Sequence, residues 1–178
     1  MRVFIAIDIP QKTKDNLERS ARQFSDYAAK GRFTVKDNYH LTLHFLGNVA
    51  ENDLIYVQSA LDSVQDMSAP ELSITQFATL RASNVVCAKF RKDEKLTLLH
   101  EKLGAKLEES GFNVEHRAYR PHVTIIRDYK FTLPFSEVTK NVDVYNIPFV
   151  ADRINLYESV FGENGVTYRK IYGITLKS

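Results

Sequence analysis

Apolar residues recur along the chain in two spacings, one typical of strands and one typical of helices. Residues 2–8 are apolar at nearly every position, a pattern that predicts a central strand buried on both faces. After Pro10 the apolar residues follow helical spacing as far as Ala28, and we expect this helix to end before Gly31. Two more helical stripes are predicted over residues 54–64 and 96–107.

The remaining apolar runs predict strands. Two of them begin at His40 and His122, and others are expected at 33–35, 72–77, 85–91, 112–117, 142–150, 152–161 and 166–176. The turn at residues 162–165 predicts a hairpin between the last two. Because the strands cluster and the helices do not alternate regularly with them, an α+β fold with antiparallel sheets and helices packed on the outside is favoured. We expect residues 1–178 to form a single bilobal domain with a central cleft between two sheets.

Composition adds a few bounds. The chain is 44% hydrophobic and 26% charged, as in ordinary globular proteins. Its net charge of +2 is too small for a protein that holds long nucleic acid through many phosphates, so a small anion or the end of an RNA strand fits better. The apolar start is cut short by Asp8 and is too brief for a signal peptide or a membrane span, so we expect a cytoplasmic protein without membrane contact. The single cysteine, Cys87, lies in an apolar strand and is expected in the core.

Each half of the chain contains a His and a Thr separated by one apolar residue. His40 and Thr42 form the first pair, and His122 and Thr124 form the second. Since successive side chains of a strand point to opposite faces, each His shares a face with its Thr. If the two strands face each other, two imidazoles and two hydroxyls flank one space. That set of groups suits proton transfer across a phosphate.

Two neighbouring residues are further candidates. Strict alternation puts Arg127 on the face opposite His122, so it reaches the site only if the strand ends or bulges near Ile126. His44 has the parity of His40 and is a possible substrate contact at the rim of the cleft. The Cα atoms of His40 and His44 would lie roughly 13 Å apart along a strand, too far to ligate one metal ion easily, so no metal site is expected. Alternation also places Tyr39 and Phe45 in the core.

Two other histidines are expected outside the site, His100 as a boundary or surface residue and His116 at the surface. His100 lies on a helix without a polar companion at a useful spacing, and His116 is flanked by charged residues.

The sequence resembles the 2H phosphoesterases, in particular the bacterial and archaeal RNA 2′,3′-cyclic phosphodiesterases once called 2′-5′ RNA ligases. The matching segments are residues 2–7, 40–47, 119–127 and 156–159, with Tyr168 downstream. The resemblance implies pseudo-twofold symmetry, no metal or other cofactor, and cleavage of a 2′,3′-cyclic phosphate to leave a 2′-phosphate.

The resemblance also implies roles for individual residues. His40 would protonate the leaving 3′ oxygen and His122 would activate water, although the sequence alone leaves that order open. Thr42, Thr124 and Arg127 would bind the phosphate. Where the family commonly has a Trp, this chain has Phe33, a possible substrate contact together with Tyr157 and Tyr168.

RNA ends or nucleoside 2′,3′-cyclic phosphates are therefore the expected substrates of a monomeric enzyme. Two alternatives stay open at this point. One is ATP-independent 2′-5′ joining of RNA ends, the reverse reaction with a ribose hydroxyl in place of water. The other is a non-catalytic module that binds RNA ends.

Overall fold

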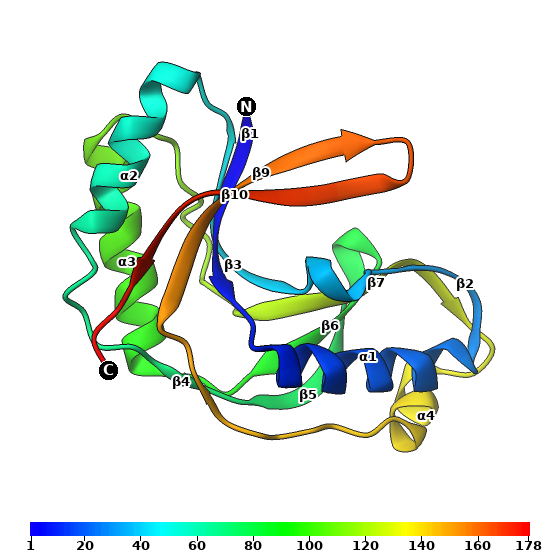
Figure 1. Ribbon diagram of the computed structural model, residues 1–178. Coiled ribbons are helices and arrows are strands. Elements are labelled where there is room, and N and C mark those ends of the chain that lie inside the picture. Colours follow the sequence, from blue (N-terminus) through cyan, green and yellow to red (C-terminus); the bar gives the residue numbers. More distant parts are fainter.

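Two four-stranded antiparallel sheets form the frame of the molecule (Figure 1). The computed structural model describes all residues from 1 to 178. The first sheet has the order β10-β9-β1-β3, formed by Gly165–Thr175, Arg153–Gly162, Arg2–Asp8 and His40–Asn48. The second has the order β2-β7-β6-β5, formed by Ala28–Phe33, His122–Phe131, Val85–Phe90 and Ile74–Leu80. A small pair joins β4 (Glu71–Leu72) to β8 (Phe149–Val150).

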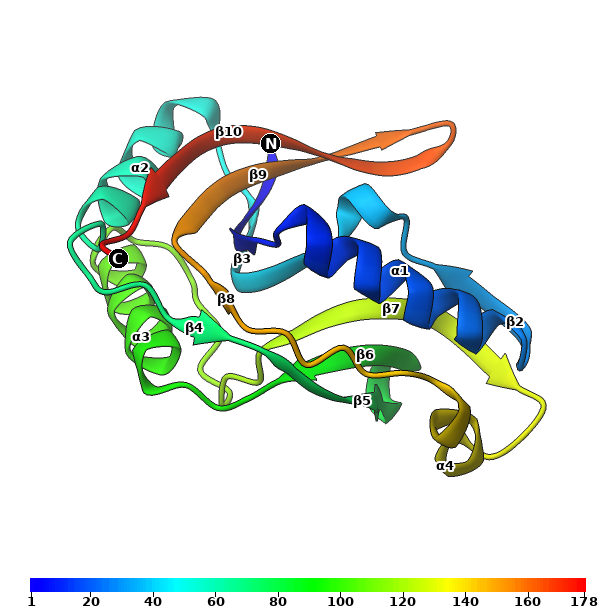
Figure 2. The same ribbon diagram turned by 60° about the horizontal axis from the view of Figure 1, so that its bottom comes forward.

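The helices cover the outer faces of the two sheets (Figures 1 and 2). Helix α1 (Gln11–Ser25) packs on β7, whereas α2 (Leu54–Asp62) and α3 (Glu94–Glu109) pack against β10 and β3 of the other sheet. The short helical elements are α4 (Phe135–Val138), η1 (Lys36–Asn38), η2 (Glu51–Asp53), η3 (Arg81–Ser83) and η4 (Thr139–Asn141). This arrangement confirms the α+β class with antiparallel sheets, outer helices and a His-Thr strand in each sheet.

Apolar stripes on the helices explain why they pack where they do. In α1 the ring of Phe24 is fully buried and meets Phe77 at 5.0 Å and Phe131 at 5.8 Å, so the helix is fixed to the second sheet. Helix α3 begins where the Asp93 carboxylate accepts from the backbone N–H of Leu96 at 2.9 Å. Its buried stripe consists of Leu96, Leu99, Leu103 and Leu107. One cluster of 37 buried residues includes side chains of both sheets.

One predicted helix and two predicted strands differ from the structure. Helix α1 ends at Ser25, and the residues from Ala28 onward pair with β7 as strand β2, because sheet pairing outweighs the helical spacing of Ala28. Residues 112–117 form a loop, and of the expected strand at 142–150 only Phe149–Val150 pairs. No helix is both long enough and apolar enough to cross a membrane.

Candidate active site

The two His-Thr strands begin with the same local geometry. His40 is the first residue of β3, and His122 is the first residue of β7. The Nδ1–H of His40 donates to the carbonyl of Asn38 at 2.7 Å, and the Nδ1–H of His122 donates to the carbonyl of Arg120 at 2.8 Å. Because a carbonyl oxygen only accepts, Nδ1 carries the proton in both rings. Nε2 of each ring is then the nitrogen that can give or take a proton.

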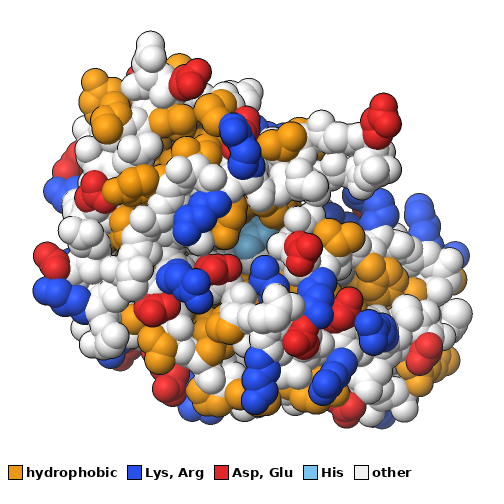
Figure 3. Space-filling model, viewed as in Figure 1, with side chains coloured by type: hydrophobic (Ala, Val, Ile, Leu, Met, Phe, Trp, Pro, Cys, Tyr) orange, Lys and Arg blue, Asp and Glu red, His pale blue; other side chains and the backbone are white.

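The strands that carry these histidines lie against each other, although they belong to different sheets. The hydroxyl of Tyr119, in the segment that leads into His122, donates to the carbonyl of Thr42 at 2.9 Å. This hydrogen bond ties the approach to one motif to the strand of the other. In the space-filling view a histidine side chain is recessed in the middle of the face shown, with both basic and acidic side chains around it (Figure 3).

His40 is neutral at neutral pH. Its pKa is lowered to about 4, mainly because burial disfavours the charged ring. The positive charges of Arg127 and His122 act in the same direction, and the hydrogen bond to the Asn38 carbonyl acts against them. The pKa of His40 is therefore sensitive to the charges of both Arg127 and His122.

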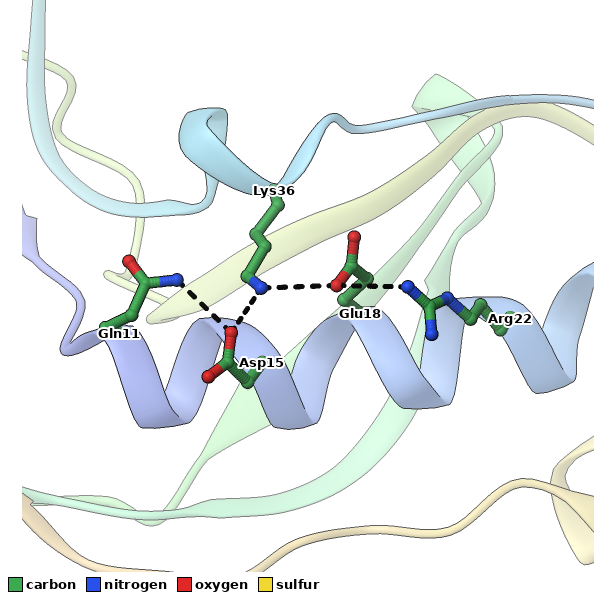
Figure 4. Close-up of polar contacts among 5 residues, drawn as sticks. All are labelled: Gln11, Asp15, Glu18, Arg22 and Lys36. Atoms are coloured by element: carbon green, nitrogen blue, oxygen red, sulfur yellow. Dashed lines mark hydrogen bonds and ion pairs between the residues drawn. The ribbon is translucent and has the colours of Figure 1, made fainter.

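The turn that precedes His40 is anchored to α1 (Figure 4). Lys36 of η1 forms ion pairs with Asp15 and with Glu18, the latter at 3.3 Å. Gln11 donates to Asp15 at 3.2 Å, and Arg22 pairs with Glu18 at 3.4 Å. The contact with Lys36 lowers the pKa of Asp15 and raises that of Lys36.

The same turn is held from its other side by the hairpin of the first sheet. The side-chain amide of Asn38 donates to the carbonyl of Val166 in β10 at 2.9 Å. The backbone carbonyl of Asn38 is also the acceptor for His40. The orientation of the His40 ring therefore depends on a turn fixed both to α1 and to β10.

Arg127 shares a face with His122 and Thr124 because β7 contains a bulge. Consecutive residues of β6 pair with Thr124 and Ile126, so Ile125 is skipped. Ile125 and Ile126 are both fully buried. The extra residue reverses the alternation and turns Arg127 to the side of His122. The condition set by the sequence, a bulge near Ile126, is met.

A matching bulge in β3 overturns two predictions. Consecutive residues of β1 pair with Thr42 and His44, so Leu43 is skipped. His44 is consequently buried, with 4% of its surface exposed, so it does not lie at the rim of the cleft as expected. Phe45, expected in the core, is 67% exposed and takes the position that Arg127 has in β7.

His44 belongs instead to a stack of three rings behind the site. It lies 4.2 Å from the ring of His100, which lies 3.9 Å from the ring of Tyr119, both nearly parallel. Burial is the main cause of a lowered pKa at His44 and lowers the pKa of His100 to about 4. Because Gly104 has no side chain, α3 can approach closely, since a Cβ there would lie 3.0 Å from His44. His100 is half-buried, as expected of a boundary residue, but the sequence did not reveal its stacking partners His44 and Tyr119.

Aromatic rings line the other side of His40. The rings of Phe4 and Tyr168 each lie 4.9 Å from the His40 ring. Phe4 also contacts Tyr157 at 5.5 Å and Phe45 at 5.9 Å. Tyr157 and Tyr168 thus lie near the site, as the sequence suggested. Phe4 was missed because the strand at residues 2–8 is apolar on both faces.

A cavity of about 670 Å³ begins at His122. It extends over β6, past Lys89, to α3 and the loop at 112–121, where His100 and Tyr119 form part of its wall. Lys89 pairs directly with His122 across the strands. A nucleotide-sized group next to His122 has room here.

Phe33 is not part of this arrangement. It pairs with Ile126, whose side chain points into the core, and it lines a shallow pocket beside Tyr39 and α1. Paired residues of a sheet share a face, so Phe33 lies on the face opposite Arg127. The structure therefore gives no support to the predicted substrate contact of Phe33, which stays a prediction.

Cys87 and His116 lie where the sequence analysis expected them. Cys87 is fully buried, and burial raises the pKa of its thiol to about 11, which leaves it protonated and unreactive. His116 is exposed and contacts Glu108 at 2.8 Å. No group of three or more His, Cys, Asp or Glu side chains is placed to hold a metal ion.

Two imidazoles with free Nε2 atoms, two threonines and a guanidinium on the adjacent strands β3 and β7 are the kinds of group that a phosphoesterase site uses. Comparison with known proteins agrees with that class. The family model described as LigT like phosphoesterase matches residues 7–87. The chain is 32% identical to the RNA 2′,3′-cyclic phosphodiesterase of Methanocaldococcus jannaschii, covering 96% of this chain and 98% of the relative. It is 26% identical to the enzyme of the same name from Thermotoga maritima, covering 97% and 94%.

The fold agrees as well. A crystal structure of Escherichia coli LigT complexed with 3′-AMP superposes with a TM-score of 0.86 at 24% identity, covering 99% of this chain and 98% of that one. The chain belongs to the LigT-like phosphoesterase family of the 2H superfamily. It is a hydrolase.

Proposed function

We propose that this phosphoesterase hydrolyses the 2′,3′-cyclic phosphate ends of RNA to 2′-phosphomonoesters, without a metal ion. The observation that carries the proposal is the pair of imidazoles, His40 and His122, each fixed through Nδ1 with Nε2 free. The names of the relatives support the substrate class, and the nucleotide bound to LigT supports a site of nucleotide size.

The reaction needs two proton transfers at opposite sides of phosphorus. Nε2 of His122 takes a proton from water, whose oxygen forms a new bond to phosphorus. The bond between phosphorus and the 3′ oxygen breaks in line, and Nε2 of His40 gives that oxygen its proton. The phosphate remains on the 2′ oxygen.

Thr42, Thr124 and Arg127 bind the non-bridging oxygens of the phosphate. Negative charge develops there as water adds to phosphorus, so donors already in place lower the barrier. A guanidinium also presents a fork of N–H groups that matches two phosphate oxygens. The side chains of both motifs thus act on a single phosphate.

The low pKa of His40 bears on its role as the acid. Free of substrate, its ring is neutral at neutral pH. A bound phosphate anion beside the ring favours the charged form and raises the pKa, so binding of substrate itself prepares the acid. The assignment of His40 as acid and His122 as base follows the family resemblance.

The proposed activity is tested with an oligonucleotide that ends in a 2′,3′-cyclic phosphate, incubated in EDTA. We expect a product with a 2′-phosphate, and loss of at least about 100-fold in rate for His40→Ala and for His122→Ala. His116→Ala is the matched control, since His116 is exposed and outside the site. Full rate in both site variants, or a 3′-phosphate product, would overturn the proposal.

A modified substrate tests the order of the two histidines. When sulfur replaces the 3′ bridging oxygen, the leaving thiolate needs no proton. His40→Ala should then recover much of its lost rate, whereas His122→Ala should not. The reverse pattern would exchange the two roles.

A further inference from the structure

The sheet face that carries His40 continues beyond the site along the β9–β10 hairpin. Alternation along β9 places Tyr157, Ser159 and Phe161 on this face, and Tyr168 pairs with Ser159 across the hairpin. Tyr168 lies against His40, so the face is continuous with the candidate active site. The hairpin, drawn orange to red, extends to the upper right in Figure 1, above the sheet that contains β7.

Two large aromatic rings on this face are open to solvent. Phe45 is 67% exposed and Phe161 is 69% exposed, the two highest values among the exposed large hydrophobic residues. Exposed aromatic rings beside a site for a nucleotide phosphate are suited to base stacking, because every base has a flat π-face. Phe45 contacts Phe4, which in turn contacts His40, so this ring is two contacts away from the imidazole.

Positive charge accompanies these rings. The guanidinium of Arg2 lies 5.7 Å from the centre of the Phe161 ring, and Lys170 pairs with Tyr157 on the same face. Neither cation forms an ion pair with a carboxylate. On the opposite face of the hairpin, by contrast, Arg169 is paired with a glutamate. The cations that remain unpaired are those on the active-site side, where phosphates would pass.

The extent of this surface exceeds a single nucleotide. Phe161 lies four residues beyond Tyr157 along β9, which corresponds to roughly 13 Å. A nucleoside whose cyclic phosphate lies at His40 can use Tyr168 or Phe45, but reaching Phe161 requires further nucleotides. The surface would serve no purpose for a mononucleotide.

We propose that the substrate is a single-stranded RNA chain whose bases upstream of the cyclic phosphate stack on Phe45 and Phe161, with its phosphates beside Arg2 and Lys170. This inference rests on the proposed function and specifies its substrate class. The specificity for RNA length then resides in the hairpin, and the chemistry resides in the two histidines.

The test compares cytidine 2′,3′-cyclic phosphate with a ten-nucleotide single-stranded RNA that ends in the same cyclic phosphate. The measured quantity is the ratio of kcat/KM for the two substrates. Wild type should prefer the RNA, and Phe161→Ala should reduce that preference by about 5- to 150-fold, the usual effect of losing one stacked base. Phe161→Trp keeps a flat ring and should retain the preference. Val160→Ala removes an exposed apolar side chain from the opposite face of the hairpin and should leave both rates unchanged.

Affinity is measured separately, by fluorescence anisotropy of the same RNA ending in a 3′-phosphate, so that the result does not depend on turnover. Weaker binding by Phe161→Ala than by Val160→Ala supports the inference. Equal ratios and affinities in the two variants overturn it, and so does a change in sedimentation showing that Phe161 joins two copies of the chain. A wild-type protein that hydrolyses neither substrate contradicts the proposed function instead, while the binding data still decide the stacking surface.

Discussion

Removal of the Arg127 side chain tests whether the bulge in β7 serves the chemistry. The bulge turns the guanidinium toward His122 and close enough to His40 to lower its pKa. Hydrogen bonds to a charged group are worth about 1.5–3 kcal/mol. Since each 1.36 kcal/mol is a factor of ten, Arg127→Ala should lower kcat/KM by roughly 10- to 150-fold.

The assay is the hydrolysis of cytidine 2′,3′-cyclic phosphate as a function of pH. Arg127→Lys keeps the charge without the fork of donors and should lose less than Arg127→Ala. Because a positive charge disfavours protonation of His40, its removal raises the pKa of His40, and the acid limb of the profile should move to higher pH. Arg81→Ala removes an exposed arginine from the same sheet region and is the control.

A kcat/KM for Arg127→Ala within twofold of wild type would refute this reasoning. So would an equal loss in Arg81→Ala, because that result would indicate a general effect of net charge rather than a contact with phosphate.

Three further predictions follow from the site and the ring stack. The profile of kcat/KM against pH should show an acid limb near pH 4, set by His40. Catalysis needs one protonated and one neutral imidazole, and the fraction of enzyme in that state depends on pH in the same way whichever ring is the acid. An acid limb near pH 6.5 would contradict the low pKa of His40. In the stack, the pKa values of His44 and His100 lie below the unfolded value of 6.5, so the unfolded state binds more protons as the pH drops. The free energy of unfolding should therefore fall between pH 6.5 and about 4, by about 1–2 kcal/mol for the half-buried His100. Urea titrations of His100→Phe should show a smaller fall than those of wild type. Tyr119→Phe keeps the stack but loses the hydrogen bond to the Thr42 carbonyl. This loss should reduce the stability by about 0.5–1.5 kcal/mol and lower kcat. An unchanged Tm and kcat would contradict a role of this bond in positioning the two strands.

The elements that follow a clear period could be predicted from the sequence. The alternation around His40 and His122 correctly predicted that the intervening Leu41 and Val123 are buried, because these residues precede the bulges. The stripe from Leu96 to Leu107 likewise identified α3. These features depend on local periodicity, which the sequence displays directly.

The bulges themselves depend on the neighbouring strands. The adjacent apolar residues Ile125 and Ile126 gave a local signal for the bulge in β7. The predicted contact of Arg127 with phosphate depended on that bulge. In β3 the corresponding pair is Leu43 and His44, and the polar His44 hid the same signal. Its burial depends on α3, where the backbone carbonyl of His100, 56 residues further along the chain, accepts from His44 Nε2 and the His100 ring stacks on it.

Long-range contacts also explain what was missed around the site. The hydroxyl of Tyr119 reaches a carbonyl 77 residues earlier, and the amide of Asn38 reaches a carbonyl 128 residues later. Neither residue stands out in its own segment. Such contacts become visible only when the two sheets are placed against each other.

The central claim is that His40 and His122, from two different sheets, act on the same phosphate. It is tested most directly by a double-mutant cycle on an RNA with a 2′,3′-cyclic phosphate end, measured in EDTA. Residues that act as a unit are strongly non-additive, so His40→Ala, His122→Ala and the double variant should fall to nearly the same residual rate. Wild-type rate in either single variant would contradict the claim.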